Sequence, residues 1–233
     1  MEPILQADSI GKMFRDRRVL SSACVAAAPG EVVGLLGRTG EGKSTLVRIC
    51  AGQSRSDSGW VKYKGEICDP PRLSSMASGG VYYLPESGSL ARSLTLQGHF
   101  DLFRDRFRLG SEDELVDDFE LRDLLGASPA AMSTGERRRA EMALVFYRQP
   151  ECLLADELFR DLDPITAERV GRVLRILAQD GCAVIVTGHE VRAMAPCLTS
   201  IVWLTSGTTY SLGRPEVAWN NEYFRREYLG PAE

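Results

Sequence analysis

Residues 31–44 read Glu-Val-Val-Gly-Leu-Leu-Gly-Arg-Thr-Gly-Glu-Gly-Lys-Ser, and this stretch predicts how the chain folds. The apolar run Val32 to Leu36 is typical of a short buried strand. Gly37 to Ser44 then fits the spacing G-x-x-x-x-G-K-[ST], and the amphipathic run Lys43 to Cys50 predicts a helix. A glycine turn without a ligand would not explain this context. Strand, glycine-rich loop and helix in this order indicate the opening of an α/β nucleotide-binding fold.

The glycine-rich loop suits nucleotide phosphates. Its glycines let backbone N–H groups close around phosphate oxygens, and the N-terminus of the following helix adds the positive end of its dipole. Lys43 can reach the terminal phosphates, and the Ser44 hydroxyl can ligate Mg²⁺. We therefore expect nucleotide phosphates to be bound by the loop residues Gly37, Arg38, Thr39, Gly40, Glu41, Gly42, Lys43, Ser44 and Thr45.

A second motif ends in two adjacent carboxylates. The apolar run Leu153 to Ala155 predicts a strand, and Asp156 and Glu157 follow it directly. Taken alone, such a pair is more often a solvated loop. Placed about 110 residues after a P-loop, it favours a catalytic interpretation, in which Asp156 orients Mg²⁺ and Glu157 polarises the attacking water.

The rest of the chain predicts an α/β fold with additions. Apolar segments at 4–10 and 19–28 flank a basic turn and predict paired strands. Charged segments with helical spacing between 94 and 131 predict a helical lobe inserted into the core. We expect one domain over residues 1–233, with a core of 1–93 and 150–233 that carries both the parallel sheet and an antiparallel β subdomain, and a helical lobe of 94–149.

Later segments alternate between helix and strand. Apolar residues recur at helical spacing in 136–147 and in 170–177, and short apolar strands are predicted at 152–155 and 183–187. The stretch 222–229 predicts a terminal helix. Such alternation implies a mainly parallel sheet that binds its ligand at the carboxyl ends of the strands.

Composition limits the functional classes. The 233 residues are 44% hydrophobic, carry a formal net charge of −4 and have a pI near 5.4, which argues against nucleic-acid binding by a basic surface. No apolar run approaches the roughly 20 residues of a membrane-spanning helix. The start Met-Glu-Pro-Ile lacks the features of a secretory signal, so we expect a cytoplasmic protein. The six cysteines show no metal-ligand spacing.

A third motif carries a resemblance to a family. Met132-Ser-Thr-Gly-Glu-Arg-Arg-Arg139 resembles the signature sequence of ABC ATPases. Asp161-Leu-Asp163-Pro164 is similar to the family's D-loop, and Thr187-Gly-His189-Glu190 to its switch histidine. The resemblance runs through essentially the whole chain. Within the family, the chain looks most similar to the ATPases of the lipopolysaccharide exporter and of the branched-chain amino-acid importers.

The resemblance implies a shared active site. Two chains would pack head to tail, with ATP and Mg²⁺ between the P-loop of one chain and Ser133, Thr134 and Gly135 of the other. His189 would contact the γ-phosphate, Lys43 and Glu157 would act in catalysis, and Asp163 would belong to the nucleotide site. Phe14 matches the aromatic residue that stacks on adenine, although from the sequence alone a core phenylalanine is an equal alternative. His99 has no partner motif and is interpreted as structural.

Several positions depart from the family pattern. Glu86 stands where the family has a glutamine that helps ligate Mg²⁺, so we count Glu86 with Ser44 and Asp156 as a predicted metal ligand. Thr134 replaces the first glycine of the signature, and Leu158 and Asp161 replace a proline and a glycine. The departures indicate either a slow homodimer or a heterodimer with a second ABC ATPase, in which one composite site hydrolyses ATP quickly.

The resemblance implies a transporter motor. We expect an ATPase that works with integral-membrane transport subunits and lies peripherally on the cytoplasmic face of the inner (plasma) membrane, with no nucleic acid as partner. One alternative is a soluble ABC ATPase that acts on nucleic acid or ribosomes. Another is a module that senses nucleotide with weak hydrolysis.

Overall fold

The computed structural model describes residues 2–230, whose strands form one curled, ten-stranded sheet. The strand order across the sheet is β5-β4-β1-β2-β10-β9-β3-β8-β7-β6. In chain order the strands are β1 (Leu5–Phe14), β2 (Arg17–Ala27), β3 (Val32–Leu36), β4 (Ser58–Tyr63), β5 (Glu66–Cys68), β6 (Val81–Leu84), β7 (Cys152–Ala155), β8 (Ala183–Gly188), β9 (Ser200–Thr205) and β10 (Thr208–Gly213).

The sheet has a parallel and an antiparallel part. Strand β3 pairs in parallel with β8 and β9, and β7 pairs in parallel with β8 and β6. Strands β1, β2, β4 and β5 pair antiparallel, and one parallel bridge between Thr208 and Ser22 joins β10 to β2. The predicted mainly parallel sheet with an antiparallel β addition is confirmed. The carboxyl ends of β3, β7 and β8 therefore meet at one edge.

Helices pack on both faces of this sheet and beyond its end. In chain order they are α1 (Lys43–Cys50), α2 (Leu73–Ser78), α3 (Leu96–Phe107), α4 (Asp113–Asp118), α5 (Thr134–Arg148), α6 (Pro164–Gln179), α7 (Val191–Met194), α8 (Pro215–Ala218) and α9 (Glu222–Phe224). Short 3₁₀ turns occupy Arg122–Leu124, Pro129–Ala131 and Ala195–Cys197.

Two hydrophobic clusters hold the core. One buries α1 residues such as Leu46 and Ile49 against Leu5 and Ile10 of β1, so α1 is enclosed by the curl of the sheet. The other packs α6 against β3, β7 and β8. Burial on both sides explains why the central strands are continuous apolar runs. This packing fixes the loop between β3 and α1, which carries the P-loop sequence.

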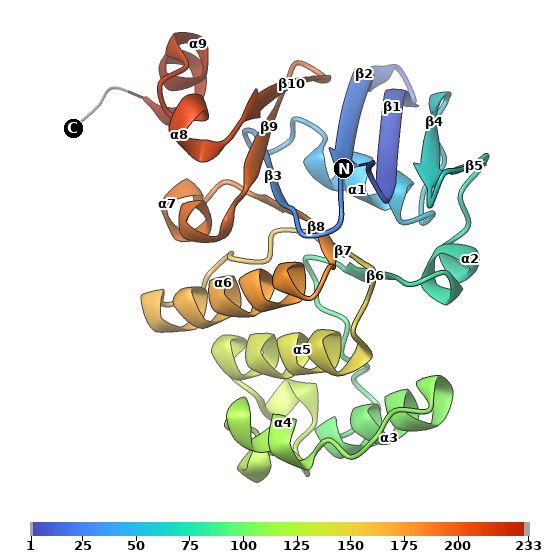
Figure 1. The fold of residues 1–233 in the computed structure, drawn as a ribbon, viewed down its shortest axis with the longest axis vertical. Coiled ribbons are helices and arrows are strands. Elements are labelled where there is room, and N and C mark those ends of the chain that lie inside the picture. Colours follow the sequence, from blue (N-terminus) through green and yellow to red (C-terminus); the bar gives the residue numbers. More distant parts are fainter. Residues whose placement is uncertain (1, 231–233) are drawn as a thin grey trace.

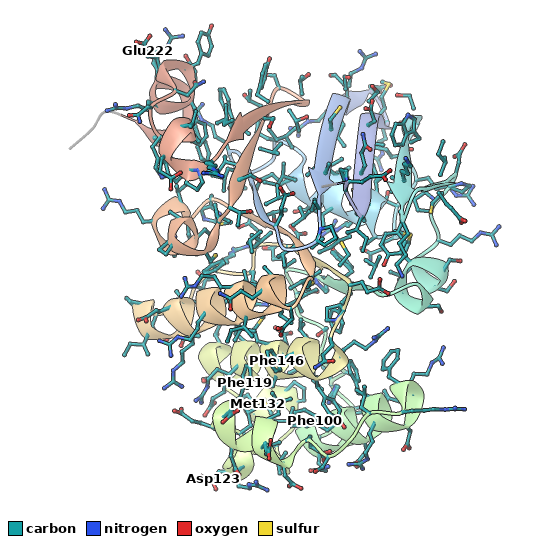
Figure 2. The ribbon with its side chains drawn as sticks, in the orientation of Figure 1. Phe100, Phe119, Asp123, Met132, Phe146 and Glu222 are labelled. Atoms are coloured by element: carbon teal, nitrogen blue, oxygen red, sulfur yellow. The ribbon has the colours of Figure 1, made fainter. Side chains whose placement is uncertain are left out.

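The segment predicted as helical is helical. Helices α3, α4 and α5 gather at one end of the molecule, opposite β1, β2 and β4 (Figure 1). Phe100 and Met132 are buried among these helices, and the Phe119 ring lies 6.2 Å from that of Phe146 (Figure 2). Met142 and Val145 of α5 pack instead with the core cluster. The division into a core and a lobe of 94–149 therefore stays a prediction, because α5 contributes to both clusters.

The predicted helix at 222–229 forms only in part. Helix α9 ends at Phe224, and a π-helical turn occupies Arg225–Leu229. This turn places Tyr228 on Phe224, with ring centroids 5.2 Å apart, and Phe224 in turn packs on Trp203 and Trp219. The aromatic contacts explain why the segment follows tertiary packing rather than regular helical geometry.

His99 and most cysteines have structural surroundings. His99 is buried, accepts a hydrogen bond from the Ala91 backbone N–H through Nε2, and has its Nδ1 2.7 Å from Thr95 O, which confirms its structural interpretation. Cys50, Cys152, Cys182 and Cys197 are buried, and burial raises the pKa of each thiol. Within residues 2–230 no helix is both long enough and apolar enough to cross a membrane.

Candidate active site

The loop between β3 and α1 is shaped by its glycines. A Cβ at Gly37 would lie 2.4 Å from the carbonyl oxygen of Leu204, so only glycine fits there. Gly40 and Gly42 have φ values of 85° and 107°, a region that other residues rarely adopt. Among residues 2–230, no atom outside Gly40 and its two chain neighbours lies within 4 Å of a Cβ built on Gly40. The loop therefore leaves open space above backbone that begins a helix, as an anion-binding loop requires.

The side chain of Lys43 is enclosed by this loop. It is only 4% exposed, and Nζ donates to Gly37 O at 2.8 Å and to Arg38 O at 3.2 Å. Nζ also lies 3.3 Å from Glu157 Oε1. The ammonium group is thus held at the mouth of the loop by groups that it can exchange for phosphate oxygens.

Asp156 lies at the end of β7 and is fully buried. Its Oδ1 accepts hydrogen bonds from Ser44 Oγ at 2.8 Å and from Thr187 Oγ1 at 2.7 Å. Its Oδ2 is buried without a hydrogen-bond partner among residues 2–230, and Arg48 Nη2 lies 3.9 Å away. Burial raises the pKa of Asp156 above its usual value. A buried carboxylate oxygen left unpaired beside a serine hydroxyl fits a divalent cation, which prefers such oxygen ligands.

Glu157 forms the link between three elements. Its backbone N–H donates to Thr187 Oγ1 at 2.9 Å, and its Oε2 lies 2.9 Å from Nδ1 of His189. Because Oε1 lies near Lys43, the carboxylate spans the space between the P-loop and the end of β8. This geometry suits a group that orients and deprotonates a water.

These side chains line one cavity of about 510 Å³. Most of the lining consists of residues predicted from the sequence to bind nucleotide or metal or to act in catalysis: Phe14, Thr39, Gly40, Gly42, Lys43, Ser44, Thr45, Glu86, Glu157 and His189. Asp156 lies beneath the cavity, out of contact with solvent. Phe14 is 50% exposed at the end of β1, which disfavours the alternative of a core phenylalanine.

Other predicted site residues lie outside this cavity lining. Ser133 caps α5 in a capping box with Glu136, and Asp163 caps α6 by accepting from the N–H groups of Ile165 and Thr166. The hydroxyl of Thr166 also donates to Asp163, and these bonds lower the pKa of that carboxyl. A Cβ at Gly135 would lie 3.9 Å from Asp163 Oδ2, so the signature and D-loop residues are neighbours of each other.

Two P-loop side chains point to other partners. Glu41 Oε2 accepts from the backbone N–H of Ser206 at 2.6 Å, and Arg38 Nη2 donates to the backbone oxygen of Glu227 at 2.6 Å. The hydroxyl of Tyr228 is buried near Gly37, and burial raises its pKa to about 12. The turn Arg225–Leu229 therefore contacts the P-loop and supports it.

Glu86, a predicted metal ligand, forms an ion pair with Arg160. Arg160 also contacts Asp161, with its Nε 3.4 Å from Oδ2. The metal role of Glu86 stays a prediction, and in this structure the partner of its carboxylate is a guanidinium group.

Arg160 and Arg17 also line the cavity, although neither was predicted from the sequence as a site residue. No role was predicted for the Thr187 hydroxyl either. The position of Arg160, three residues after Glu157, was a signal that could have identified it. The contacts of Thr187 and Tyr228 follow only from the fold.

Comparisons with known proteins show which family the chain belongs to. The sequence profile of the family described as ABC transporter matches residues 20–160. Similar curated proteins include the lipopolysaccharide export system ATP-binding protein LptB of Haemophilus influenzae and that of Escherichia coli strain K12. Each is 31% identical to this chain, with 97% of both chains covered. A probable ABC transporter ATP-binding protein of Azorhizobium caulinodans is also 31% identical and covers 98% of this chain and 84% of its own.

Solved structures show the same fold. The ADP conformation of MJ1267, an ATP-binding cassette of an ABC transporter, superposes with a TM-score of 0.84 at 16% identity and covers 99% of this chain. A nucleotide-free ATP-binding cassette from an ABC transporter gives a TM-score of 0.82, also at 16% identity. None of these comparisons supports a nucleic-acid-directed or ribosomal ATPase. The chain belongs to the ABC transporter family and is an ATP-binding, ATP-hydrolysing subunit that powers a membrane transporter.

Proposed function

We propose that this chain is a Mg²⁺-dependent ATPase in which Ser44 and Asp156 hold the metal and Glu157 activates the water. One observation carries the proposal: the buried Asp156 accepts from Ser44 through one oxygen and leaves the other oxygen without a partner. A bound Mg²⁺ would supply charge neutralisation for the phosphates. Lys43 would bind the terminal phosphates, and His189 would hold Glu157 in place and contact the γ-phosphate.

The chain works as a dimer with a shared site in this proposal. Ser133, Thr134 and Gly135 do not line the cavity of about 510 Å³ in the same chain. If they bind the γ-phosphate, they come from a second subunit, which is this chain again or a second ABC ATPase. The capping box orders the start of α5 and occupies the backbone N–H groups of Ser133 and Glu136, so those of Thr134 and Gly135 would be the ones to bind phosphate oxygens.

The membrane partner is a set of integral-membrane transport subunits, with this chain on the cytoplasmic face of the membrane. The relatives named for lipopolysaccharide export make that the first substrate class to test. A groove beside the helical segment, lined in part by Tyr82, Phe103, Phe107 and Arg148, offers an apolar surface to a short partner helix.

The catalytic part is tested by ATP hydrolysis with and without Mg²⁺. Glu157→Gln should lower turnover by at least about 100-fold, because a positioned base contributes that much or more, while ATP binding persists. Glu120→Gln, an exposed carboxylate of the helical segment, is the matched control and should leave turnover unchanged. Unchanged turnover in Glu157→Gln would refute the assignment of the base.

The transport part is tested by tagging the chain in its native cell and extracting membranes with mild detergent. A multispanning membrane protein recovered in stoichiometric amount supports the proposal and identifies the transporter. Recovery from the cytosol alone contradicts it.

A further inference from the structure

The rim of the cavity contains a cation that the shared mechanism above does not use. Arg160 lines the same cavity as Lys43, Ser44 and Glu157, and its side chain is 50% exposed. Its guanidinium contacts two carboxylates, Glu86 from the segment after β6 and Asp161 from its own loop.

The three cationic side chains of the described cavity lining differ in the groups that hold them in place. Lys43 is enclosed and bonded to two backbone carbonyls. Arg17 lies at the start of β2, near the exposed ring of Phe14. Arg160 alone of the three is joined to partly exposed carboxylates, since Glu86 is 37% and Asp161 77% exposed. Ion pairs of this kind are weakly held and screened by solvent.

A nucleotide triphosphate competes well for such a guanidinium. An arginine binds phosphate oxygens through two parallel N–H donors, and a triphosphate carries more negative charge than one carboxylate. Resting on the proposed function, we propose that Arg160 is a nucleotide-contacting residue. Its guanidinium is paired with Glu86 while the site is empty. Entry of ATP moves the guanidinium from Glu86 to a phosphate of the nucleotide.

This exchange gives a function to the carboxylate at position 86, where the resemblance to the family implies a glutamine. A carboxylate at position 86 retains Arg160 in the empty site and releases it in the filled one, so nucleotide entry changes the contact between the loop after β7 and the segment that leads to α3. A neutral glutamine at position 86 would hold Arg160 less firmly. The pair therefore makes ATP affinity depend jointly on residues 86 and 160.

The test is a double-mutant cycle on equilibrium ATP binding by the full chain, measured with Mg²⁺ and again in EDTA. Arg160→Ala should weaken ATP binding in EDTA by at least about tenfold, and less with Mg²⁺, because the metal then neutralises part of the phosphate charge. Glu86→Gln should tighten binding about threefold or more in EDTA. This gain should vanish when Arg160→Ala is also present.

Two further variants separate contact from folding. Arg160→Lys should recover part of the affinity, because it restores the charge without the fork of donors. Arg172→Ala removes a comparably exposed arginine that pairs with Glu168 on α6, and it should leave ATP binding unchanged. Thermal unfolding of each variant verifies that it is folded.

Two outcomes overturn the inference: less than twofold change in Arg160→Ala, or an equal effect of Glu86→Gln with and without Arg160. Absence of ATP binding by the unaltered chain would instead refute the proposed function. If Arg160→Ala does not fold, Arg160→Gln takes its place in the cycle.

Discussion

Two parts of the nucleotide cavity hold their charges differently. We call Lys43 and Ser44, which line the cavity, and Asp156 and Thr187, which lie beneath them, the inner wall. The side chains of Lys43, Asp156 and Thr187 are at most 4% exposed, and all four residues hydrogen-bond to protein groups. At the outer rim, formed by Phe14, Glu86 and Arg160, between 37% and 50% of each side chain is exposed.

The difference shows where a substitution is tolerated. A buried polar group that loses its partner has no water to replace it, so a change at the inner wall disturbs several residues at once. At the outer rim, water or a ligand replaces a lost partner. The outer rim therefore tolerates a carboxylate at Glu86, where the resemblance to the family implies a glutamine.

The largest effect is expected from Lys43→Ala at the inner wall. Loss of a charge-assisted bond to phosphate should weaken ATP binding by about 30- to 150-fold, equivalent to about 2–3 kcal/mol. Equilibrium binding measures this, and Lys64→Ala, which removes an exposed lysine paired with Glu151, is the control. If Lys43→Ala binds ATP as tightly as the unaltered chain, the inner wall does not bind the phosphates.

Next in size is Thr187→Val, which keeps the shape and removes the hydroxyl. The buried N–H of Glu157 and Oδ1 of Asp156 each lose a bond, so the free energy of unfolding should fall by about 1–3 kcal/mol. Urea denaturation measures the change. Thr205→Val, at the end of β9, is the control for a strand threonine outside the inner wall. A similar fall in its free energy of unfolding would show that the effect is not specific to the inner wall.

Asp156→Asn should raise the free energy of unfolding of the nucleotide-free protein near neutral pH, because it removes a buried charge and keeps a side-chain oxygen for Ser44 and Thr187. Burial raises the pKa of Asp156, so its contribution to stability is present at low pH and is lost as pH rises through the folded-state pKa. The advantage of asparagine should therefore be smaller near pH 4, close to the ordinary aspartate pKa of 3.8, than at pH 7.5 in urea titrations. An advantage that is the same at both pH values would show that the charge is not its cause.

Phe14→Ala at the outer rim should have the smallest effect. A lost aromatic stack costs about 0.5–1.5 kcal/mol, which weakens ATP binding about 2- to 10-fold. Because the ring is half exposed, the melting temperature should stay unchanged. Inorganic triphosphate, which has no base, should bind both proteins equally. A fall in its affinity as well would place Phe14 near the phosphates.

Much of the site could be predicted because its motifs are local. The order of strand, loop and helix around Gly37 to Ser44 places the P-loop in one continuous segment, and β7 ends at the residue before Asp156 as predicted. The helical segment after residue 94 was also predictable from its charged stretches with helical spacing. The π-helical turn near Tyr228 was missed because stacking on Phe224 depends on a distant strand, β9.

The sequence by itself determined the α/β class, the P-loop and the residues at the strand ends, because each depends on neighbours along the chain. Only the tertiary structure decided which partners these residues have. Thr187 meets Asp156 because β7 and β8 are adjacent, and Arg160 meets Glu86 because the loop after β7 lies beside the end of β6. Contacts between segments far apart in sequence depend on how the sheet is ordered, and no local pattern specifies them.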